Sequence, residues 1–134
     1  MIVDTSALIC IALDEPMASA VWQALARAQD PTVSAANLLE SWMVVDRRNA
    51  DVAQRLDALL VDAGLSVAPV TREHVTIARD AFRVYGKGSG HKAQLNFGDC
   101  IAYGLAKSMN EPLLFIGNDF IHTDLVPALA SASE

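Results

Sequence analysis

The chain has 134 residues, a formal net charge of −6 and a sequence pI of about 4.9. With 52% hydrophobic and 19% charged residues, it suits one folded domain over residues 1–134 and excludes a disordered chain. The acidic balance argues against a simple basic module that binds nucleic acid, but not against an enzyme that reaches phosphates through bound cations.

The first third of the chain alternates short strands with helices. Residues 1–3 form an apolar run that is typical of a buried strand, and Asp4 stands where this strand gives way to a short helix over residues 7–13. A second helix runs to about residue 29, and residues 32–35 predict the next strand. Asp4 is either a helix cap or a functional residue at the carboxyl end of a strand.

The middle of the chain continues the alternation. Asn37 is the expected N-cap of a helix that carries Glu40 in its first turn, and on local evidence this pair is a capping box. A further helix over residues 51–63 leads into a strand over residues 65–70.

Residues 72–85 form the next predicted helix, with Thr71 as its N-cap. Apolar residues recur at helical spacing along one side and are expected to be buried: Val75, Ala78, Phe82 and Tyr85. Basic residues form a second stripe that continues into the following loop: Arg72, Arg79, Arg83, Lys87 and Lys92. Most such stripes are solvated surfaces, and contact with phosphates is the alternative.

A glycine-rich loop over residues 86–92 precedes the last long helix. It lacks the spacing of a P-loop, and contact with a polyanion and a simple mobile connection are equally open. Asn96 is the predicted N-cap of a helix from residue 97, which puts Asp99 in the first turn, at the positive end of the helix dipole. Taken alone, Asp99 only completes the cap.

The C-terminal part begins with a continuous apolar run over residues 113–116, which predicts a central buried strand. Asp119 follows its end, and Asp124 lies in a short turn. Residues 126–129 suit a short helix, and residues 131–134 are expected to be loose.

Four carboxylates stand out in this pattern of strands and helices: Asp4, Glu40, Asp99 and Asp119, with Asp124 as a candidate fifth. Two follow strands and two lie in first turns of helices, and right-handed crossovers bring the carboxyl ends of parallel strands to one edge of a sheet. We therefore expect them to converge. Converging carboxylates repel one another unless cations neutralise them or their pKa values rise. Oxygen ligands without Cys or His suit Mg²⁺ or Mn²⁺ and metal-assisted hydrolysis of a phosphodiester.

Cys10 and Cys100 lack the spacing of a metal or redox motif, and we interpret them as buried thiols of a reduced, cytoplasmic protein. The N-terminus enters a predicted strand directly, without a basic segment, so no signal peptide is expected. No apolar run is long enough to cross a membrane.

The ordered set of motifs resembles the PIN domain, and within it the VapC toxins of bacterial toxin–antitoxin pairs. The resemblance covers nearly the whole chain and rests on Met1-Ile2-Val3-Asp4-Thr5-Ser6-Ala7, Glu40, Gly86-Lys87-Gly88, Leu95-Asn96-Phe97-Gly98-Asp99-Cys100 with Tyr103, and Leu114-Phe115-Ile116-Gly117-Asn118-Asp119-Phe120 with Thr123-Asp124. Each motif is weak alone, and their order is specific. Asn118 departs from the family, which often has an acid there, and this would weaken a second metal site.

The resemblance implies a three-layer α/β fold with a short central parallel sheet of about four to five strands flanked by helices. It implies an endoribonuclease dependent on Mg²⁺ or Mn²⁺, which leaves a 5′-phosphate, forms a homodimer and is inhibited by a VapB-type antitoxin covering the site. The family's metal site falls on Asp4, Glu40, Asp99 and Asp119, with Ser6, Asn118 and Asp124 as supports and Thr5 as a backbone contributor at most. The basic stripe with Lys92 would hold RNA. Trp22 and Trp42 are candidates for core packing, which is favoured, or for an antitoxin groove.

Three other functions compete with this one. A catalytically silent PIN-like module would bind RNA or protein only, but it has no use for four mutually repelling acids. A phosphatase with Asp4 as its nucleophile would need a second Asp two residues later, where Ser6 stands. A receiver-like switch domain would need a Lys after the strand at residues 113–116, where Asn118 and Asp119 stand.

Overall fold

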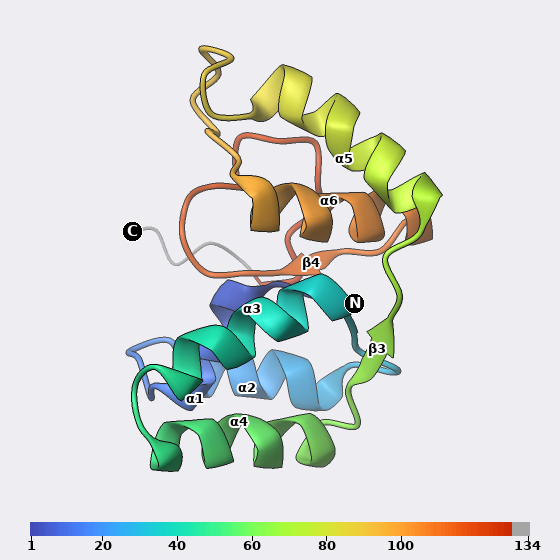
Figure 1. The fold of residues 1–134 in the computed structure, drawn as a ribbon. Coiled ribbons are helices and arrows are strands. Elements are labelled where there is room, and N and C mark those ends of the chain that lie inside the picture. Colours follow the sequence, from blue (N-terminus) through green and yellow to red (C-terminus); the bar gives the residue numbers. More distant parts are fainter. Residues whose placement is uncertain (130–134) are drawn as a thin grey trace.

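The computed structural model describes residues 1–129, which form short strands alternating with helices (Figure 1). The strands are β1 (Ile2–Val3), β2 (Thr32–Ser34), β3 (Ser66–Ala68) and β4 (Leu113–Leu114). The helices are α1 (Thr5–Ala12), α2 (Ala18–Arg27), α3 (Ala35–Asp46), α4 (Ala50–Asp62), α5 (Arg72–Tyr85) and α6 (Phe97–Met109). No helix in this range is long and apolar enough to cross a membrane.

The strands form one parallel sheet in the order β3-β2-β1-β4. β4 therefore lies beside β1 at one end of this order, and the prediction of a central strand over residues 113–116 is wrong in position and length. Its apolar residues are buried because helices and the C-terminal segment cover them, and beyond β4 only a single bridge joins Leu113 to Pro127. A short apolar run cannot by itself distinguish these two situations.

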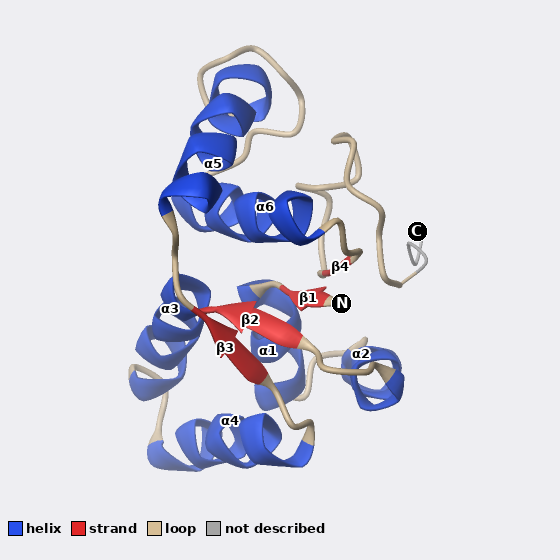
Figure 2. Cartoon of the chain, turned by 90° about the vertical axis from the view of Figure 1, so that its right-hand side faces the viewer, coloured by secondary structure: helices blue, strands red, loops and turns tan. Residues whose placement is uncertain are grey.

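Helices cover both faces of the sheet, as Figure 2 shows, which confirms the predicted three-layer α/β fold. Neighbouring strand residues point to opposite faces. Ile2 and Leu113 pack with α5 and α6, whereas Val3 and Leu114 pack with α1, α2, α3 and α4. All strands run in the same direction, so the segments that follow their carboxyl ends gather along one edge.

The caps of two helices place acidic residues at this edge. Asp4 caps α1, and Asn96 and Asp99 form a capping box at the start of α6. The start of α3 was predicted wrongly, because Ser34 is its cap and Asn37 lies within the first turn. Ser34 ends β2 and accepts the hydrogen bond from the backbone N–H of Ala36, so the strand passes directly into the helix.

The predicted buried side of α5 is only partly correct, since Ala78 is buried and Tyr85 packs against the core. Val75 and Phe82 are about half exposed, whereas His74, Ala78 and Ala81 are buried. The helix packs on α6 through these smaller side chains, and a Cβ atom at Gly104 of α6 would lie 2.5 Å from the carbonyl oxygen of His74. Close packing of the two backbones therefore leaves the larger apolar residues of α5 at the surface.

The C-terminal segment follows the sheet without forming the predicted short helix over residues 126–129. The backbone N–H of Ala128 donates to the carbonyl oxygen of Leu113, which is an extended, strand-like contact. The expectation of a loose end over residues 131–134 lies outside the described residues. The single domain over residues 1–134 stays a prediction.

Candidate active site

Asp4 lies at the carboxyl end of β1 and is only 4% exposed. Its Oδ2 accepts hydrogen bonds from the backbone N–H of Ser6 at 3.0 Å and from the Ser6 hydroxyl at 2.6 Å. The same hydroxyl accepts from the backbone N–H of Ile116 at 3.0 Å, so Ser6 fixes Asp4 relative to the segment after β4. The pKa of Asp4 is raised to about 6. Burial is the main cause and the charge of Glu40 adds to it, whereas the hydrogen bonds from Ser6 lower the pKa.

Glu40 lies in α3, and its carboxylate is held from two sides. The Thr5 hydroxyl donates to Glu40 Oε1 at 2.6 Å, and the Asn37 side-chain amide donates to the same oxygen at 3.4 Å. A Cβ atom at Gly98, in the first turn of α6, would lie 2.6 Å from Glu40 Oε2. Only glycine therefore allows α6 to begin this close to the carboxylate. Thr5 contributes through its side chain, which corrects the expectation of a backbone role at most.

Asp99 lies in the first turn of α6, close to both Asp4 and Asp119. It is 8% exposed, and its Oδ2 accepts from the backbone N–H of Asn96 at 3.0 Å. Burial is the main cause that raises the pKa of Asp99 to about 7, and the charges of Asp4 and Asp119 add to it. The charge of Glu40 thus acts on Asp4, and the charges of Asp4 and Asp119 act on Asp99, so these carboxylates are near neighbours. The structure thus brings Asp4, Glu40 and Asp99 to one cleft, and Asp119 lies near enough to affect the pKa of Asp99.

A cleft of about 310 Å³ opens between these elements. It is lined by two kinds of side chain: the acidic and polar residues Asp4, Thr5, Ser6, Glu15, Glu40, Asn96 and Asp99, and the apolar residues Ile9, Val44 and Ile116. None of its lining residues is basic, so no side chain of the cleft itself neutralises the carboxylates. Asp119 does not line the cleft and is exposed next to Asn118.

Two groups of predicted site residues lie elsewhere. Asp124 accepts hydrogen bonds from the Tyr103 hydroxyl at 2.6 Å and from Lys107 at 3.0 Å. Burial works to raise the pKa of Asp124, but these two bonds outweigh it and lower the pKa. Asp124 is therefore paired away from the cleft, contrary to its predicted supporting position. The stripe residues Arg72, Arg79 and Arg83 are exposed along α5, and none of them lines the cleft.

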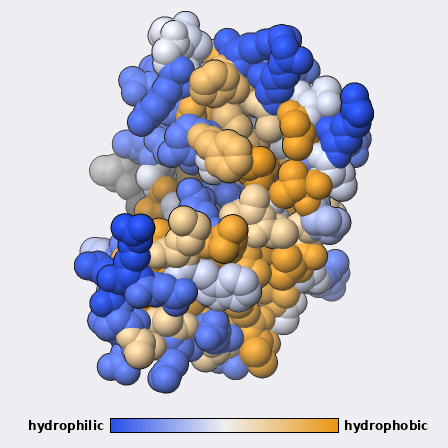
Figure 3. Space-filling view, viewed as in Figure 1, coloured by the Kyte–Doolittle hydropathy of each residue, from blue (hydrophilic) through white to orange (hydrophobic). Residues whose placement is uncertain are grey.

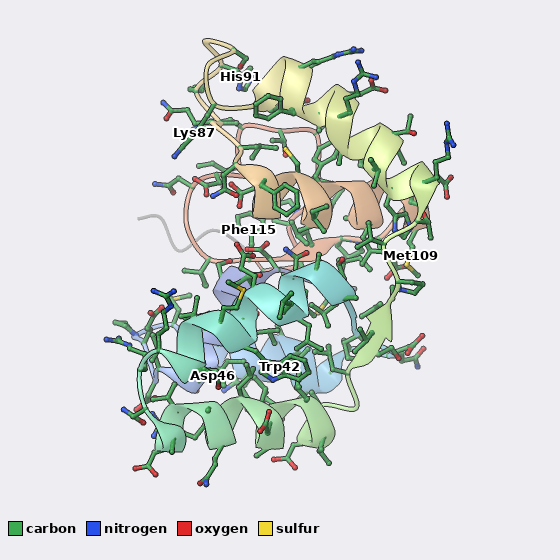
Figure 4. All side chains as sticks on the ribbon, viewed as in Figure 1. Trp42, Asp46, Lys87, His91, Met109 and Phe115 are labelled. Atoms are coloured by element: carbon green, nitrogen blue, oxygen red, sulfur yellow. The ribbon has the colours of Figure 1, made fainter. Side chains whose placement is uncertain are left out.

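Lys87 and Lys92 belong to the loop between α5 and α6, in which Figure 4 labels Lys87 and His91. The loop is ordered by its own contacts. Hydrogen bonds join Lys87 to Leu95 and Leu95 to Tyr85, and the His91 ring packs edge-on against Tyr85 at a centroid distance of 4.9 Å. These contacts connect the two ends of the loop just before α6 begins.

The donor set of the cleft fits a hard divalent cation. It offers carboxylate oxygens without Cys or His, and none of its lining residues is basic. Within residues 1–129, no three acidic, His or Cys side chains are placed to surround one ion by themselves. Mg²⁺ does not need such a cage, because it keeps several waters and binds through one or two carboxylates with phosphate oxygens of the substrate.

The free energy of unfolding is expected to fall as the pH rises from about 4 to about 7 when a chelator keeps cations away. The pKa values of Asp4 and Asp99 rise from 3.8 to about 6 and about 7 in the folded protein. The folded state therefore holds protons that the unfolded chain releases in this window, and this stabilising contribution is complete below pH 3.8 and lost above about pH 7. Denaturant midpoints measured across the window test it. Asp99→Asn should show a smaller fall, and an equal fall would contradict this origin.

Sequence reasoning missed Asn37 as a contact of Glu40 and Gly98, and it missed Glu15 in the wall of the cleft. The spacing of Asn37 and Glu40 did place both on one side of α3, but the pattern was interpreted as a helix start. No signal around Glu15 pointed to the cleft, since its position depends on how the loop between α1 and α2 folds back.

Comparison with known proteins gives the same family throughout. The PIN domain family matches residues 1–125. The chain is 48% identical to the ribonuclease VapC28 of Mycobacterium tuberculosis over 130 residues, which cover 96% of this chain and 98% of that protein. It is 43% identical to the ribonuclease VapC42 of the same species over 129 residues, with coverage of 96% and 98%.

The fold is also similar to a solved structure. The crystal structure of VapC20 from Mycobacterium tuberculosis, described as a Sarcin-Ricin loop cleaving toxin, matches with a TM-score of 0.72 and 17% sequence identity. The match covers 93% of this chain and 95% of that one. At this identity the likeness concerns the fold alone.

Proposed function

This chain belongs to the PIN domain family, and from this premise we propose that it is a metal-dependent endoribonuclease toxin of the VapC type, which hydrolyses phosphodiester bonds of RNA. The observation that carries the proposal is one cleft lined by the carboxylates of Asp4, Glu40 and Asp99, with Asp119 close enough to raise the pKa of Asp99. A catalytically silent binding module is the alternative, and nothing in such a module would offset the cost of burying Asp4 and Asp99 next to Glu40.

We assign the four acids to the binding of Mg²⁺ or Mn²⁺. A divalent cation in this position activates water and stabilises the charge that develops on the phosphate. The Ser6 hydroxyl orients Asp4, and the Thr5 hydroxyl orients Glu40. The backbone N–H of Asn96 donates to one oxygen of Asp99 and so orients its carboxylate. Asn118 beside Asp119 offers a neutral carbonyl oxygen only, in keeping with a weak second site.

Cleavage of a labelled RNA pool by the antitoxin-free protein tests the proposal. We expect cuts with Mn²⁺ or Mg²⁺, none with chelator, and products that carry a 5′-phosphate. A rise in melting temperature with Mn²⁺ would report cation binding independently of the substrate, because ligand binding to the folded state stabilises it by mass action. Absence of both cleavage and stabilisation would favour the silent module.

We propose a VapB-type antitoxin as the partner that inhibits the enzyme. Support comes from exposed apolar side chains of α3: Val44 lines the cleft, and Leu39, Trp42 and Met43 line a second hollow with Asp57 of α4. Trp42 lies between α3 and α4 in Figure 4 and donates to Asp57 at 3.1 Å, so the expected core packing is wrong for this residue. Trp22 is partly buried against the core, as expected.

We also propose a homodimer, supported by an apolar groove of about 680 Å³ between α5, α6 and the start of α3. Exposed apolar residues line it: Val70, Val75, Phe82 and Phe97, the last of which is 79% exposed. Figure 3 shows hydrophobic residues gathered on this face. A group of large exposed apolar side chains is typical of an interface. The molecular mass in solution decides between a dimer and a monomer.

RNA binding is proposed for the basic stripe of α5 and for Lys87 and Lys92 of the loop, acting in the cytoplasm, where RNA is found. Replacing Arg79 and Arg83 with Ala is expected to weaken RNA binding and to reduce the slope of log affinity against log salt by roughly 1.4, at about 0.7 per phosphate contact. Fluorescence anisotropy in chelator, where RNA stays uncut, measures the slope. The Lys87→Ala/Lys92→Ala pair tests the loop separately, and Arg47→Ala/Arg48→Ala is the charge-matched control. An unchanged slope would assign the tested pair to the solvated surface.

A further inference from the structure

Asn37 is a buried polar residue that contacts three elements. It is 1% exposed, and its side-chain amide donates to the carbonyl oxygen of Gly98 at 3.0 Å and to Glu40 Oε1 at 3.4 Å. Its backbone carbonyl accepts from the Thr5 hydroxyl at 3.1 Å and from the Ser41 hydroxyl at 2.8 Å. Asn37 therefore links α3 to the first residue of α1 and to the first turn of α6.

The other side-chain atom of Asn37 has no partner. Its Oδ1 is buried and forms no hydrogen bond with any of the described residues. A buried acceptor without a donor destabilises the folded state, and an apolar side chain of similar size would avoid this. Turning the amide over would bring its oxygen against two acceptors, the Gly98 carbonyl and Glu40, so the network fixes the orientation. The role of Asn37 therefore lies in the hydrogen bonds that its side-chain N–H groups donate to Glu40 and Gly98.

Only one of the two carboxylate oxygens of Glu40 accepts the hydrogen bonds from Thr5 and Asn37. Both hydrogen bonds to the carboxylate, from Thr5 and from Asn37, end on Oε1. Neither of these bonds uses Oε2, and both oxygens lie against the first turn of α6, where a Cβ atom at Gly98 would be 2.6 Å from Oε2 and 2.7 Å from Oε1. Since Asn37 also holds the Gly98 carbonyl, it fixes the carboxylate and the start of α6 relative to each other, immediately before Asp99.

We propose that Asn37 is a positioning residue of the acidic cleft. It keeps the Glu40 carboxylate against the start of α6, so that Oε2 remains available to the cation that Asp4 and Asp99 bind. The inference rests on the proposed metal-dependent nuclease function and adds a residue to it. Partners that hold a metal-binding side chain in place typically change metal affinity by about 10–100-fold when they are removed.

The test compares Asn37→Leu with the wild type and with Ser41→Ala. Leu has a similar volume and removes both the amide donors and the unpaired oxygen. Ser41→Ala removes a neighbouring buried hydrogen bond of the same helix without touching Glu40. Mn²⁺ affinity by titration calorimetry, melting temperature in chelator, and kcat and KM for RNA cleavage are measured for each protein.

We expect Asn37→Leu to bind Mn²⁺ about 10–100-fold more weakly and to lose kcat, with KM for RNA within about twofold of the wild type. Its melting temperature in chelator should be unchanged or higher, because the unpaired acceptor is gone. Ser41→Ala should keep its Mn²⁺ affinity. Unchanged Mn²⁺ affinity in Asn37→Leu, with a lower melting temperature in chelator, would show a purely structural residue and overturn the inference.

A double variant tests whether Asn37 acts through Glu40. Adding Asn37→Leu to Glu40→Gln should cause no further loss of Mn²⁺ affinity, whereas independent residues would show additive losses. Additive losses would overturn the inference. If Asn37→Leu does not fold, Asn37→Ala gives the same comparison. A wild type that neither binds Mn²⁺ nor cleaves RNA removes the proposed function and this inference with it, whereas failure of the Asn37 comparison alone leaves the proposed function standing.

Discussion

Replacing Asp99 with Asn is expected to abolish RNA cleavage and to make the protein more stable in chelator. The cleavage rate should fall by more than the roughly 10–100-fold that loss of an outer-shell partner costs, because a cation-binding side chain itself is changed. Burial and the charges of Asp4 and Asp119 penalise the ionised carboxyl, and Asn removes that charge. Its amide oxygen can still accept from the Asn96 backbone, so the cap of α6 is kept. Single-turnover cleavage in Mn²⁺ and melting in chelator measure the two effects.

Asp62→Asn is the control for this change, since it removes the same charge from an exposed residue at the end of α4. It should cleave RNA at the wild-type rate. Asp4→Asn should behave like Asp99→Asn, because its pKa is also raised by burial. Full activity in either cleft variant would refute the assignment of the site. A lower melting temperature in chelator would refute the argument from charge repulsion.

Gly98→Ala is expected to lower both cleavage and Mn²⁺ affinity by at least about tenfold without destabilising the fold. The added methyl group would lie 2.6 Å from one oxygen of Glu40 and 2.7 Å from the other, so the carboxylate must move away from the start of α6. Alanine favours a helix over glycine by about 1 kcal/mol, which offsets the local cost of the displacement. Calorimetric titration with Mn²⁺ and melting in chelator separate the two quantities.

Gly104→Ala offers a matched control in the same helix. Its methyl group would lie 2.5 Å from the carbonyl oxygen of His74, which is backbone and cannot move aside. This variant should therefore lose stability because α5 and α6 are forced apart, whereas its folded fraction should keep the Mn²⁺ affinity of the wild type. Wild-type Mn²⁺ affinity in Gly98→Ala would instead show that the position of Glu40 does not matter for the cation.

The alternation of strands and helices could be predicted because each element carries a local signal. The apolar run before Asp4 and the cap formed by Asn96 act within a few residues of chain. The direction of parallel strands then requires that residues after their carboxyl ends share one edge. For this reason the convergence of the four acids followed from their positions, although their roles in catalysis stay a proposal.

Helix faces were predicted less well, because apolar spacing does not say what covers an apolar side. On α5, small residues face α6, while Val75 and Phe82 line an open groove. On α3, Trp42 is exposed for a similar reason, although its size predicted burial. Hydrophobicity is a property of the single residue, whereas burial depends on the neighbour that the fold provides.

The sequence by itself determined the fold class, the order of its elements and the carboxylates that meet at the edge of the sheet. Only the tertiary structure decided how those carboxylates are held. Thr5 and Glu40 are 35 residues apart, and Asn37 and Gly98 are 61 apart. Local spacing in the sequence therefore cannot predict the hydrogen bonds between them. The same holds for Asp124, which pairs with Tyr103 and Lys107 away from the cleft. Contacts between distant segments form only when the sheet and helices have packed.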